Sequence, residues 1–249
     1  MPTSTTPAEL LDFAEAPGRF LESTATLAVR ASRRYALVAE RGGTWAAVEG
    51  IRLEPAEIEP AVAEVHAFLA ETGTRVASWW LTERATPDDL EERLLDAGLA
   101  RDESDYLHAA MLAAAAPPAG PPEVEARRVA DRDELAAARR LKAEVFGTEP
   151  DDGERSSVTY GAWLDGELVA TAEATFASVG ALLTGGATLP HARGRGAYRA
   201  LVRARWDDAV ARGTPVLTVG AGPMSRPILD RLGFEQVLQF RRLESRLVT

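Results

Sequence analysis

One short segment of the chain has the residue types of a phosphate-binding turn. Residues 193–197 read Arg-Gly-Arg-Gly-Ala, between a strand-like run over 179–189 and a helical pattern over 196–212. A strand that enters a helix through glycines points free backbone N–H groups and the positive end of the helix dipole at one place. Glycine allows close approach and positive φ, and arginine adds charge-assisted hydrogen bonds to phosphate. The segment therefore predicts a pyrophosphate-binding cradle.

Two other phosphate motifs do not fit these residues. The G-x-G-x-x-G pattern of dinucleotide-binding folds is absent, and no Gly-Lys-Ser or Gly-Lys-Thr follows the glycines, as a P-loop requires. A short G-x-G before a helix is a weak signal alone. The interpretation therefore depends on the elements around the turn.

The elements around the turn indicate a mixed α/β domain. After residue 122 the predicted order is β-α-β-β-β-α-β-α-β. Asp165-Gly166 separates two strands and predicts a type I′ hairpin turn, because both central positions of that turn need positive φ. Asp131 is a candidate N-cap of the first helix. The predicted strands cover 124–129, 157–164, 167–176, 179–189, 215–219 and 234–247, and the helices cover 132–145, 196–212 and 225–232.

Two motifs resemble those of the GNAT (Gcn5-related N-acetyltransferase) superfamily. Residues 188–197, Thr-Leu-Pro-His-Ala-Arg-Gly-Arg-Gly-Ala, look like its V-x-P-x-x-R-G-x-G turn. Residues 225–234, Ser-Arg-Pro-Ile-Leu-Asp-Arg-Leu-Gly-Phe, resemble its closing helix and Leu-Gly-Phe. The likeness covers 124–247, about half of the chain. It implies an acyl-CoA N-acyltransferase fold over 123–249, an α/β (α+β) domain built on a mixed sheet.

The resemblance also implies a cofactor and a reaction. Acyl-CoA, with acetyl-CoA as the usual member, would lie between the ends of the strands predicted over 179–189 and 215–219. An amine would attack the thioester directly in a ternary complex, which requires removal of a proton from the ammonium and an oxyanion donor. The residues implied for acyl-CoA are Ala187, Thr188 and Leu189 at the pantetheine and thioester, and Arg193, Gly194, Arg195, Gly196, Ala197 and Tyr198 at the pyrophosphate.

The catalytic positions depart from the family pattern. The family's frequent proton-donating Tyr aligns with Leu229, its Asn falls near Gly222, and the strand predicted over 179–189, where a Glu base often lies, has no acid. Glu173 in the neighbouring strand is the nearest substitute, and its alternative role is a solvated carboxylate on the strand face. Ser225 could orient a water or the thiol, or simply cap the helix.

Three further residues are weaker candidates. Tyr160 and Tyr198 could act as acids, although aromatic residues in a strand or first helical turn usually pack. His191 stands where the family commonly has Gln or Arg, and a role as base is disfavoured beside the phosphates. The enzyme hypothesis, an N-acyltransferase acting on a primary amine of a small molecule or peptide, therefore stands against a degenerate protein that binds or senses acyl-CoA without turnover.

The first half of the chain repeats the order of the last part of such a domain. Strands are predicted over 30–40, 44–53, 75–81 and 105–112, with helices over 57–71 and 88–97. A spacing of 43 residues separates Pro55 from Gly98 and also Pro190 from Gly233. The phosphate turn does not repeat, since residues 54–59 contain three glutamates and no glycine. We interpret residues 1–115 as a degenerate GNAT-like lobe without CoA; the alternative is an unrelated α/β domain.

A proline-rich stretch predicts the boundary between the halves. Residues 117–122 contain four prolines, which cannot continue a helix or a central strand. We therefore expect a stiff linker over 116–122 and domains over 1–115 and 123–249. Adjacent Trp79 and Trp80 must point to opposite faces of their strand. Core packing of both is expected, and the alternative is that one of them lines a surface between the lobes.

Composition excludes several kinds of site. The net charge of −10 argues against nucleic acid as a partner and mildly favours a cationic amine. The chain has no cysteine, and its three histidines lack metal-ligand spacing, so no metal site is expected. Neither a signal peptide nor a transmembrane run is visible, which predicts a soluble cytoplasmic protein away from membranes. The sequence leaves the oligomeric state open.

Overall fold

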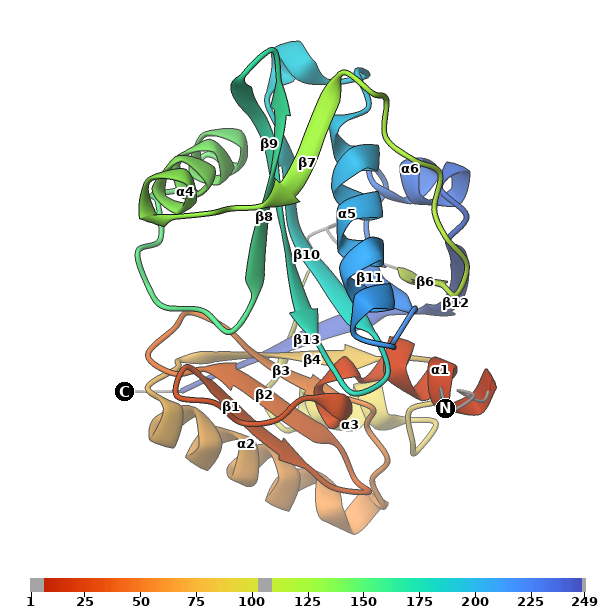
Figure 1. Cartoon of the computed structure of the whole chain (residues 1–249). Helices are drawn as coiled ribbons and strands as arrows, with labels where there is room; N and C mark the ends of the chain where they lie inside the picture. Colours follow the sequence, from red (N-terminus) through yellow and green to blue (C-terminus); the bar gives the residue numbers. More distant parts are fainter. Residues whose placement is uncertain (1–6, 103–108, 248–249) are drawn as a thin grey trace. The chain divides into compact units, whose positions relative to one another are not determined.

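The computed structural model describes residues 7–102 and 109–247, which form two mixed sheets, one of six and one of seven strands (Figure 1). Two compact units contain these sheets, one built around residues 7–102 and the other around 112–220. The predicted mixed α/β class is confirmed. None of the helices in the described ranges combines the length and apolar character needed to cross a membrane.

The seven-stranded sheet contains the predicted phosphate turn. Its strand order is β12-β6-β11-β10-β9-β8-β7. Strands β7 to β10 pair antiparallel with their neighbours, whereas β10 and β11 pair parallel. Helices α4 and α5 lie on opposite faces of this sheet (Figure 1). The elements are β6 (Ala109–Ala113), β7 (Val124–Arg128), α4 (Arg132–Phe146), β8 (Val158–Leu164), β9 (Glu167–Phe176), β10 (Ala181–Thr188), η3 (Pro190–Ala192), α5 (Ala197–Ala211), β11 (Leu217–Ala221), α6 (Arg226–Arg231) and β12 (Glu235–Gln239).

Local signals in this half of the sequence are confirmed. Asp165 and Gly166 both have positive φ, 52° and 82°, as the predicted type I′ turn between β8 and β9 requires. The Asp131 carboxylate accepts the backbone N–H groups of Asp133 and Glu134, both at 2.9 Å, and so caps α4. These short-range rules fix the ends of the elements that flank the site.

The six-stranded sheet has the order β1-β2-β3-β4-β13-β5. One prediction here is wrong: residues 30–40 form two strands instead of one, because the Ser32 side chain accepts the N–H groups of Arg34 and Tyr35 and makes a tight turn. The helix α1 was not predicted. The elements are α1 (Pro7–Glu15), η1 (Pro17–Phe20), β1 (Leu27–Ala31), β2 (Ala36–Glu40), β3 (Ala46–Glu49), η2 (Pro55–Glu57), α2 (Ile58–Thr72), β4 (Val76–Leu81), α3 (Leu90–Asp96), β5 (Ala100–Arg101) and β13 (Arg241–Arg246).

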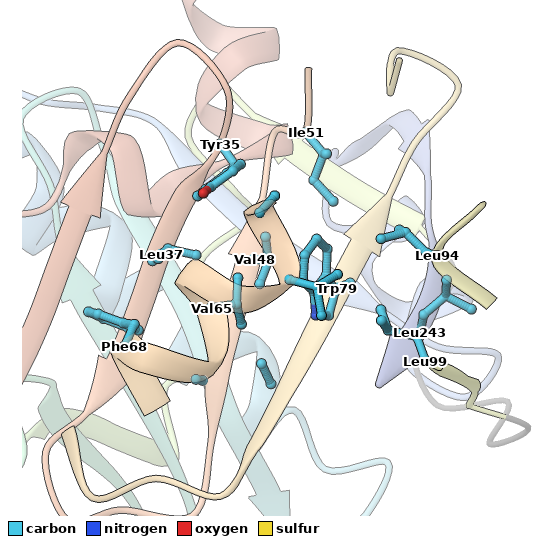
Figure 2. Packing of buried hydrophobic residues seen from close by; sticks show 14 of the residues in the cluster. Tyr35, Leu37, Val48, Ile51, Val65, Phe68, Trp79, Leu94, Leu99 and Leu243 are labelled. Atoms are coloured by element: carbon cyan, nitrogen blue, oxygen red, sulfur yellow. The ribbon is translucent and has the colours of Figure 1, made fainter. Parts of the chain in front are cut away.

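The core of this sheet is centred on Trp79. Its side chain is fully buried, and its indole N–H donates to Ser245 Oγ at 3.0 Å. Figure 2 shows Trp79 with Leu94, Leu99 and Leu243, so the core contains a residue from the distant strand β13. Trp80, on the other face of β4, packs edge to face on Phe240 with ring centroids 5.4 Å apart. Both tryptophans are therefore packing residues, as expected.

The last predicted strand, 234–247, is wrong as a single element. It is two strands, and β13 pairs antiparallel with β4 in the six-stranded sheet, whereas β12 stays in the seven-stranded one. The predicted strand over 105–112 shows the converse: its described part, β6, lies in the seven-stranded sheet, and residues 103–108 fall outside the described residues. Each sheet therefore contains one strand from the other side of residues 116–122. Periodicity predicts that a segment is a strand, but it does not name the strand's partner.

The proline-rich segment packs against α5. A Cβ on Gly120 would lie 2.5 Å from the Cβ of Ala200, so glycine is needed there for close contact. Pro117 is buried, and its carbonyl accepts Arg203 Nη1 at 3.3 Å. This part of the expected linker is thus held in place along the helix that follows the phosphate turn.

Candidate active site

The candidate cleft opens where β10 separates from β11. Their parallel pairing covers Ala181–Leu183 with Leu217–Val219 and then stops, although β10 continues to Thr188 and β11 to Ala221. In the same stretch a bulge interrupts the pairing of β10 with β9. Gly185 lies within the bulge at a φ of 63°, a left-handed conformation that favours glycine. The bulge therefore coincides with the place where β10 loses its pairing with β11.

The end of β10 presents the backbone predicted to contact acyl-CoA. Ala187 and Thr188 resume pairing with β9, and Leu189 N–H donates to the Val169 carbonyl at 3.0 Å. Because N–H and C=O groups alternate in direction along a strand, those of Thr188 point to the opposite side, where β11 has diverged. Of the three predicted residues, Thr188 is therefore the one whose backbone N–H and C=O face the opening.

The turn after β10 has the conformation of an anion-binding cradle. Gly194 and Gly196 have φ values of 78° and 84°, and Gly196 is the N-terminal cap of α5. Ala200 N–H donates to the Gly196 carbonyl, so the N–H groups of the three residues before it, 197–199, are the free donors of the first helical turn. No atom outside the turn lies within 4 Å of a Cβ built on Gly194. The open side of the turn leaves space for a phosphate.

Arginine side chains add positive charge beside this turn. Arg193 and Arg195 are exposed. Arg193 Nε donates to the Thr188 carbonyl at 3.3 Å, and Arg195 lies 3.9 Å from the Asp165 carboxylate, a distance longer than a hydrogen bond. Most donors of both guanidiniums therefore stay available to a ligand. His191 lies 3.4 Å from Glu167 on the exposed surface, which offers no support for a role as base.

Gly196 has a packing role that the sequence analysis did not foresee. A Cβ at this position would lie 2.7 Å from both Cγ and Cδ of Pro121. Close contact with the proline-rich segment therefore already requires a glycine here. The pattern Gly-x-Gly reflects two different needs, space for a ligand at Gly194 and space for Pro121 at Gly196.

Tyr198 lies over the bulge of β10. A Cβ on Gly186 would be 2.8 Å from Cε2 of its ring, so the ring packs directly on the strand. The Tyr198 side chain also interacts with Arg205, which is 1% exposed and donates to the carbonyls of Leu201 and Glu173. Burial lowers the pKa of the Arg205 guanidinium. Tyr198 thus connects α5 to the cleft strand.

Glu173 is brought to the same bulge from β9. It lies opposite Thr184, and a Cβ on Gly185 would be 3.4 Å from its Cδ. Its carboxylate accepts Lys142 Nζ at 2.6 Å and lies 3.4 Å from Ser157 Oγ. With 8% of its surface exposed, Glu173 is a buried, ion-paired group on the α4 side of the sheet. The alternative expectation of a solvated carboxylate is wrong for this residue.

Sequence reasoning missed Lys142. It lies on α4 four residues after Ala138 and beside Leu141, both buried, so it belongs to the helix face that contacts the sheet. The available signal was a lysine within the apolar stripe of a predicted helix. A charged side chain at such a position needs a partner of opposite charge in the core.

The remaining candidates have structural partners. Ser225 Oγ accepts Gly222 N–H at 3.1 Å and lies 3.4 Å from the Gly222 carbonyl, closing the turn before α6. Leu229, at the family's Tyr position, is fully buried. Tyr160 is also buried and donates to Asp208 on α5, the face opposite to Glu173; burial, together with this hydrogen bond, raises its pKa. Among the residues that the structure describes, no group of three His, Asp or Glu side chains could hold a metal ion.

The corresponding region of the six-stranded sheet is closed. Gly50, just after β3, has a φ of 60°, similar to that of Gly185 in the other sheet. Pro55 begins the short helix η2, just as Pro190 begins η3. Here, however, the segments that follow β3 and β4 stay connected, because Thr86 N–H donates to the Ile51 carbonyl at 3.2 Å and its own carbonyl accepts Leu53 N–H at 3.1 Å. The six-stranded sheet therefore has no corresponding opening at this place.

No protein-family model and no curated protein matches the chain. Solved structures do match it. A GCN5-related N-acetyltransferase from Kribbella flavida is 21% identical, with a TM-score of 0.67 over 88% of this chain and 90% of the other. A tandem GNAT protein from the clavulanic acid biosynthesis pathway is 14% identical, with a TM-score of 0.58 over 98% of this chain and 90% of the other.

A third match is a GCN5-related N-acetyltransferase from Sphaerobacter thermophilus, 15% identical, with a TM-score of 0.55 over 86% of this chain and 81% of the other. At these identities the likeness concerns the fold. It confirms the predicted fold class: the chain has the GNAT fold, and the match to a tandem GNAT protein extends over both of its sheets.

Proposed function

We propose that the protein is an acyl-CoA-dependent N-acyltransferase, with acetyl-CoA as the expected donor and a primary amine of a small molecule or peptide as the acceptor. One observation carries this proposal. The separation of β10 from β11 at the Gly185 bulge leads within a few residues into the glycine turn at the start of α5. An opening and an anion cradle in this order suit a ligand with a thioester at one end and a pyrophosphate at the other.

The cradle and the strand end would hold acyl-CoA at two points. Free N–H groups of the first turn of α5, with Arg193 and Arg195, would bind the pyrophosphate. The backbone around Thr188 would bind the pantetheine arm and polarise the thioester carbonyl. The residues proposed for this binding are Ala187, Thr188, Leu189, Arg193, Gly194, Arg195, Gly196, Ala197 and Tyr198.

Glu173 is the proposed proton acceptor, acting directly or through a water. It takes a proton from the incoming ammonium, and the neutral amine forms the new N–C bond. The nitrogen then loses its second proton to solvent, and the C–S bond breaks to release a thiolate that takes a proton from solvent. The ion pair with Lys142 positions the carboxylate beside the bulge. Ser225 is retained as a candidate that orients a water or the thiol.

The remaining assignments follow from charge and from the fold. A net charge of −10 favours a cationic amine and disfavours nucleic acid as a partner. We also keep the proposal that residues 116–122 connect two lobes over 1–115 and 123–249, each sheet being completed by one strand exchanged across this segment.

A second candidate function is acyl-CoA binding without turnover. The buried Leu229 at the family's Tyr position favours it, and so does the engagement of Glu173 by Lys142. The two functions differ in catalysis and share the cradle, so one set of experiments separates them.

The first experiment measures thermal unfolding with and without acetyl-CoA. Ligand at about 100 times its Kd should stabilise the wild type by about 2.7 kcal/mol. The double variant Arg193→Glu/Arg195→Glu should lose this stabilisation, whereas Arg140→Glu, the same kind of substitution at one exposed residue of α4, should keep it. A wild type that folds and shows no shift would refute both functions.

The second experiment measures thiol release with a panel of primary amines. Turnover that Glu173→Gln abolishes, with the affinity for acetyl-CoA nearly unchanged, would support the transferase. Binding with no turnover on any amine of the panel would favour the second function.

A further inference from the structure

A second site lies in the first lobe, within the unit built around residues 7–102. A pocket of about 200 Å³ opens beside α1, η1 and the segments that follow β3 and β4. We call it the arginine pocket. Its charged lining residues are Asp12, Glu15, Arg19, Arg33, Arg52 and Arg84. Four guanidiniums against two carboxylates leave an excess of positive charge in a protein that is strongly acidic as a whole.

Both carboxylates are already engaged. Glu15 is 3% exposed. Its carboxylate accepts hydrogen bonds from both Nη atoms of Arg52, at 3.1 and 2.8 Å, and from Arg84 Nη1 at 2.7 Å. It also accepts the Thr82 hydroxyl at 2.6 Å. Asp12 accepts Arg84 Nη2 at 2.8 Å. This network uses Arg52 and Arg84 to hold α1 against the sheet.

Within the described residues, neither of the other two arginines forms an ion pair with a carboxylate. Arg19 donates from Nη1 to the Ser32 carbonyl at 2.8 Å and from Nη2 to the Gly50 carbonyl at 2.7 Å, both neutral acceptors. Arg33 is exposed, and no side-chain hydrogen bond or ion pair joins it to the described part of the chain. Burial, and next the positive charge of Arg52, lower the pKa of Arg19, and together they outweigh the carboxylates of Glu15, Asp12 and Glu49, which raise it. An added anion would relieve this repulsion.

We propose that the arginine pocket binds a small oxyanion of the carboxylate or phosphate class, held by Arg19 and Arg33 with Arg52 and Arg84 behind them. Guanidinium groups match the paired oxygens of both kinds of anion. The volume lies below the range of about 300–1,000 Å³ usual for larger ligands, which limits the occupant to a molecule of a few heavy atoms. The pocket adjoins Gly50 and Arg52, where the first lobe lacks the opening of the second lobe.

The test uses malonate and inorganic phosphate as probes, without acyl-CoA, so it stands apart from the proposed transfer reaction. Each probe is titrated into the wild-type protein by calorimetry and by thermal unfolding, with sodium chloride matched to the same ionic strength. We expect saturable binding and a rise in Tm of the wild type. Arg33→Gln should weaken Kd roughly tenfold, as expected for loss of one charge-assisted contact. Arg41→Gln, another exposed arginine of this lobe, should leave Kd unchanged.

Two outcomes would overturn the proposal: no binding of either probe beyond that of chloride, or equal weakening by Arg33→Gln and Arg41→Gln, which would indicate general surface charge. Arg19→Gln provides a second variant, and its failure to weaken binding would also contradict the assigned site. Preference for one probe would identify the ligand as a carboxylate or a phosphate.

Discussion

The ion pair between Glu173 and Lys142 allows a sharp test of how the candidate site is built. Its atoms are 2.6 Å apart, and the two side chains are 11% and 27% exposed. Removing one partner of a fully buried pair costs about 3–5 kcal/mol, whereas an exposed pair contributes about 1 kcal/mol or less. This pair lies between these limits. We expect Glu173→Gln and Lys142→Met each to lower the free energy of unfolding by about 2 kcal/mol.

The pairwise energy comes from a double-mutant cycle. The double variant should lose little more than either single variant, which gives a coupling energy of about 1–2 kcal/mol. Urea unfolding followed by circular dichroism measures all four proteins, and equal m-values would show that only stability has changed. Additive losses would refute the claim that the two side chains stabilise each other.

The same variants separate chemistry from support. If Glu173 accepts the proton, Glu173→Gln has no measurable turnover, while Lys142→Met keeps part of it because the carboxylate remains. The affinity for acetyl-CoA should be nearly unchanged in both. Full activity of Glu173→Gln would remove Glu173 from the mechanism.

Two further predictions concern the first lobe. Leu243→Ala should lower the free energy of unfolding by about 3 kcal/mol, because the leucine is fully buried in the core around Trp79. Arg246→Ala, at an exposed residue of the same strand, should change it by less than about 0.5 kcal/mol. If urea unfolding gave similarly small losses for both variants, the placement of β13 would be contradicted. Burial raises the pKa of the Glu49 carboxyl to about 7, so the native state keeps a proton that the unfolded state loses, and stability should fall as pH rises from about 4.5 to 7. Glu49→Gln should remove a pH-dependent loss on the order of 3 kcal/mol, whereas the exposed Glu22→Gln should not. Parallel pH profiles of wild type and Glu49→Gln would refute this.

Short-range signals predicted much of the second lobe. The spacing of apolar residues and the caps gave α4 and α5 nearly at their observed bounds, and Asp165-Gly166 gave the β8–β9 turn. The conformation of the cradle at Gly194 was predictable for the same reason, because glycine is the residue that most readily adopts a positive φ. These features depend on neighbours in the sequence.

Features that depend on distant partners were not predictable. The pairing of β13 with β4 joins segments whose alternation would suit several strands. Glu173 could be named as a strand residue, but its engagement by Lys142 depends on how α4 lies on the sheet. The arginine pocket depends on α1, a nine-residue helix for which no periodic pattern was identified, and this helix supplies Asp12 and Glu15.

The exchange of β6 and β13 has a consequence for how the protein is made. Trp79 and Ser245, hydrogen-bonded in one core, are 166 residues apart in the sequence. During synthesis, the six-stranded sheet therefore lacks β13, the strand between β4 and β5, until nearly the whole chain has left the ribosome. Contacts this distant in sequence slow folding, and a half-finished sheet exposes strand edges that can pair with other chains. The exchange thus links completion of the first lobe to synthesis of the second.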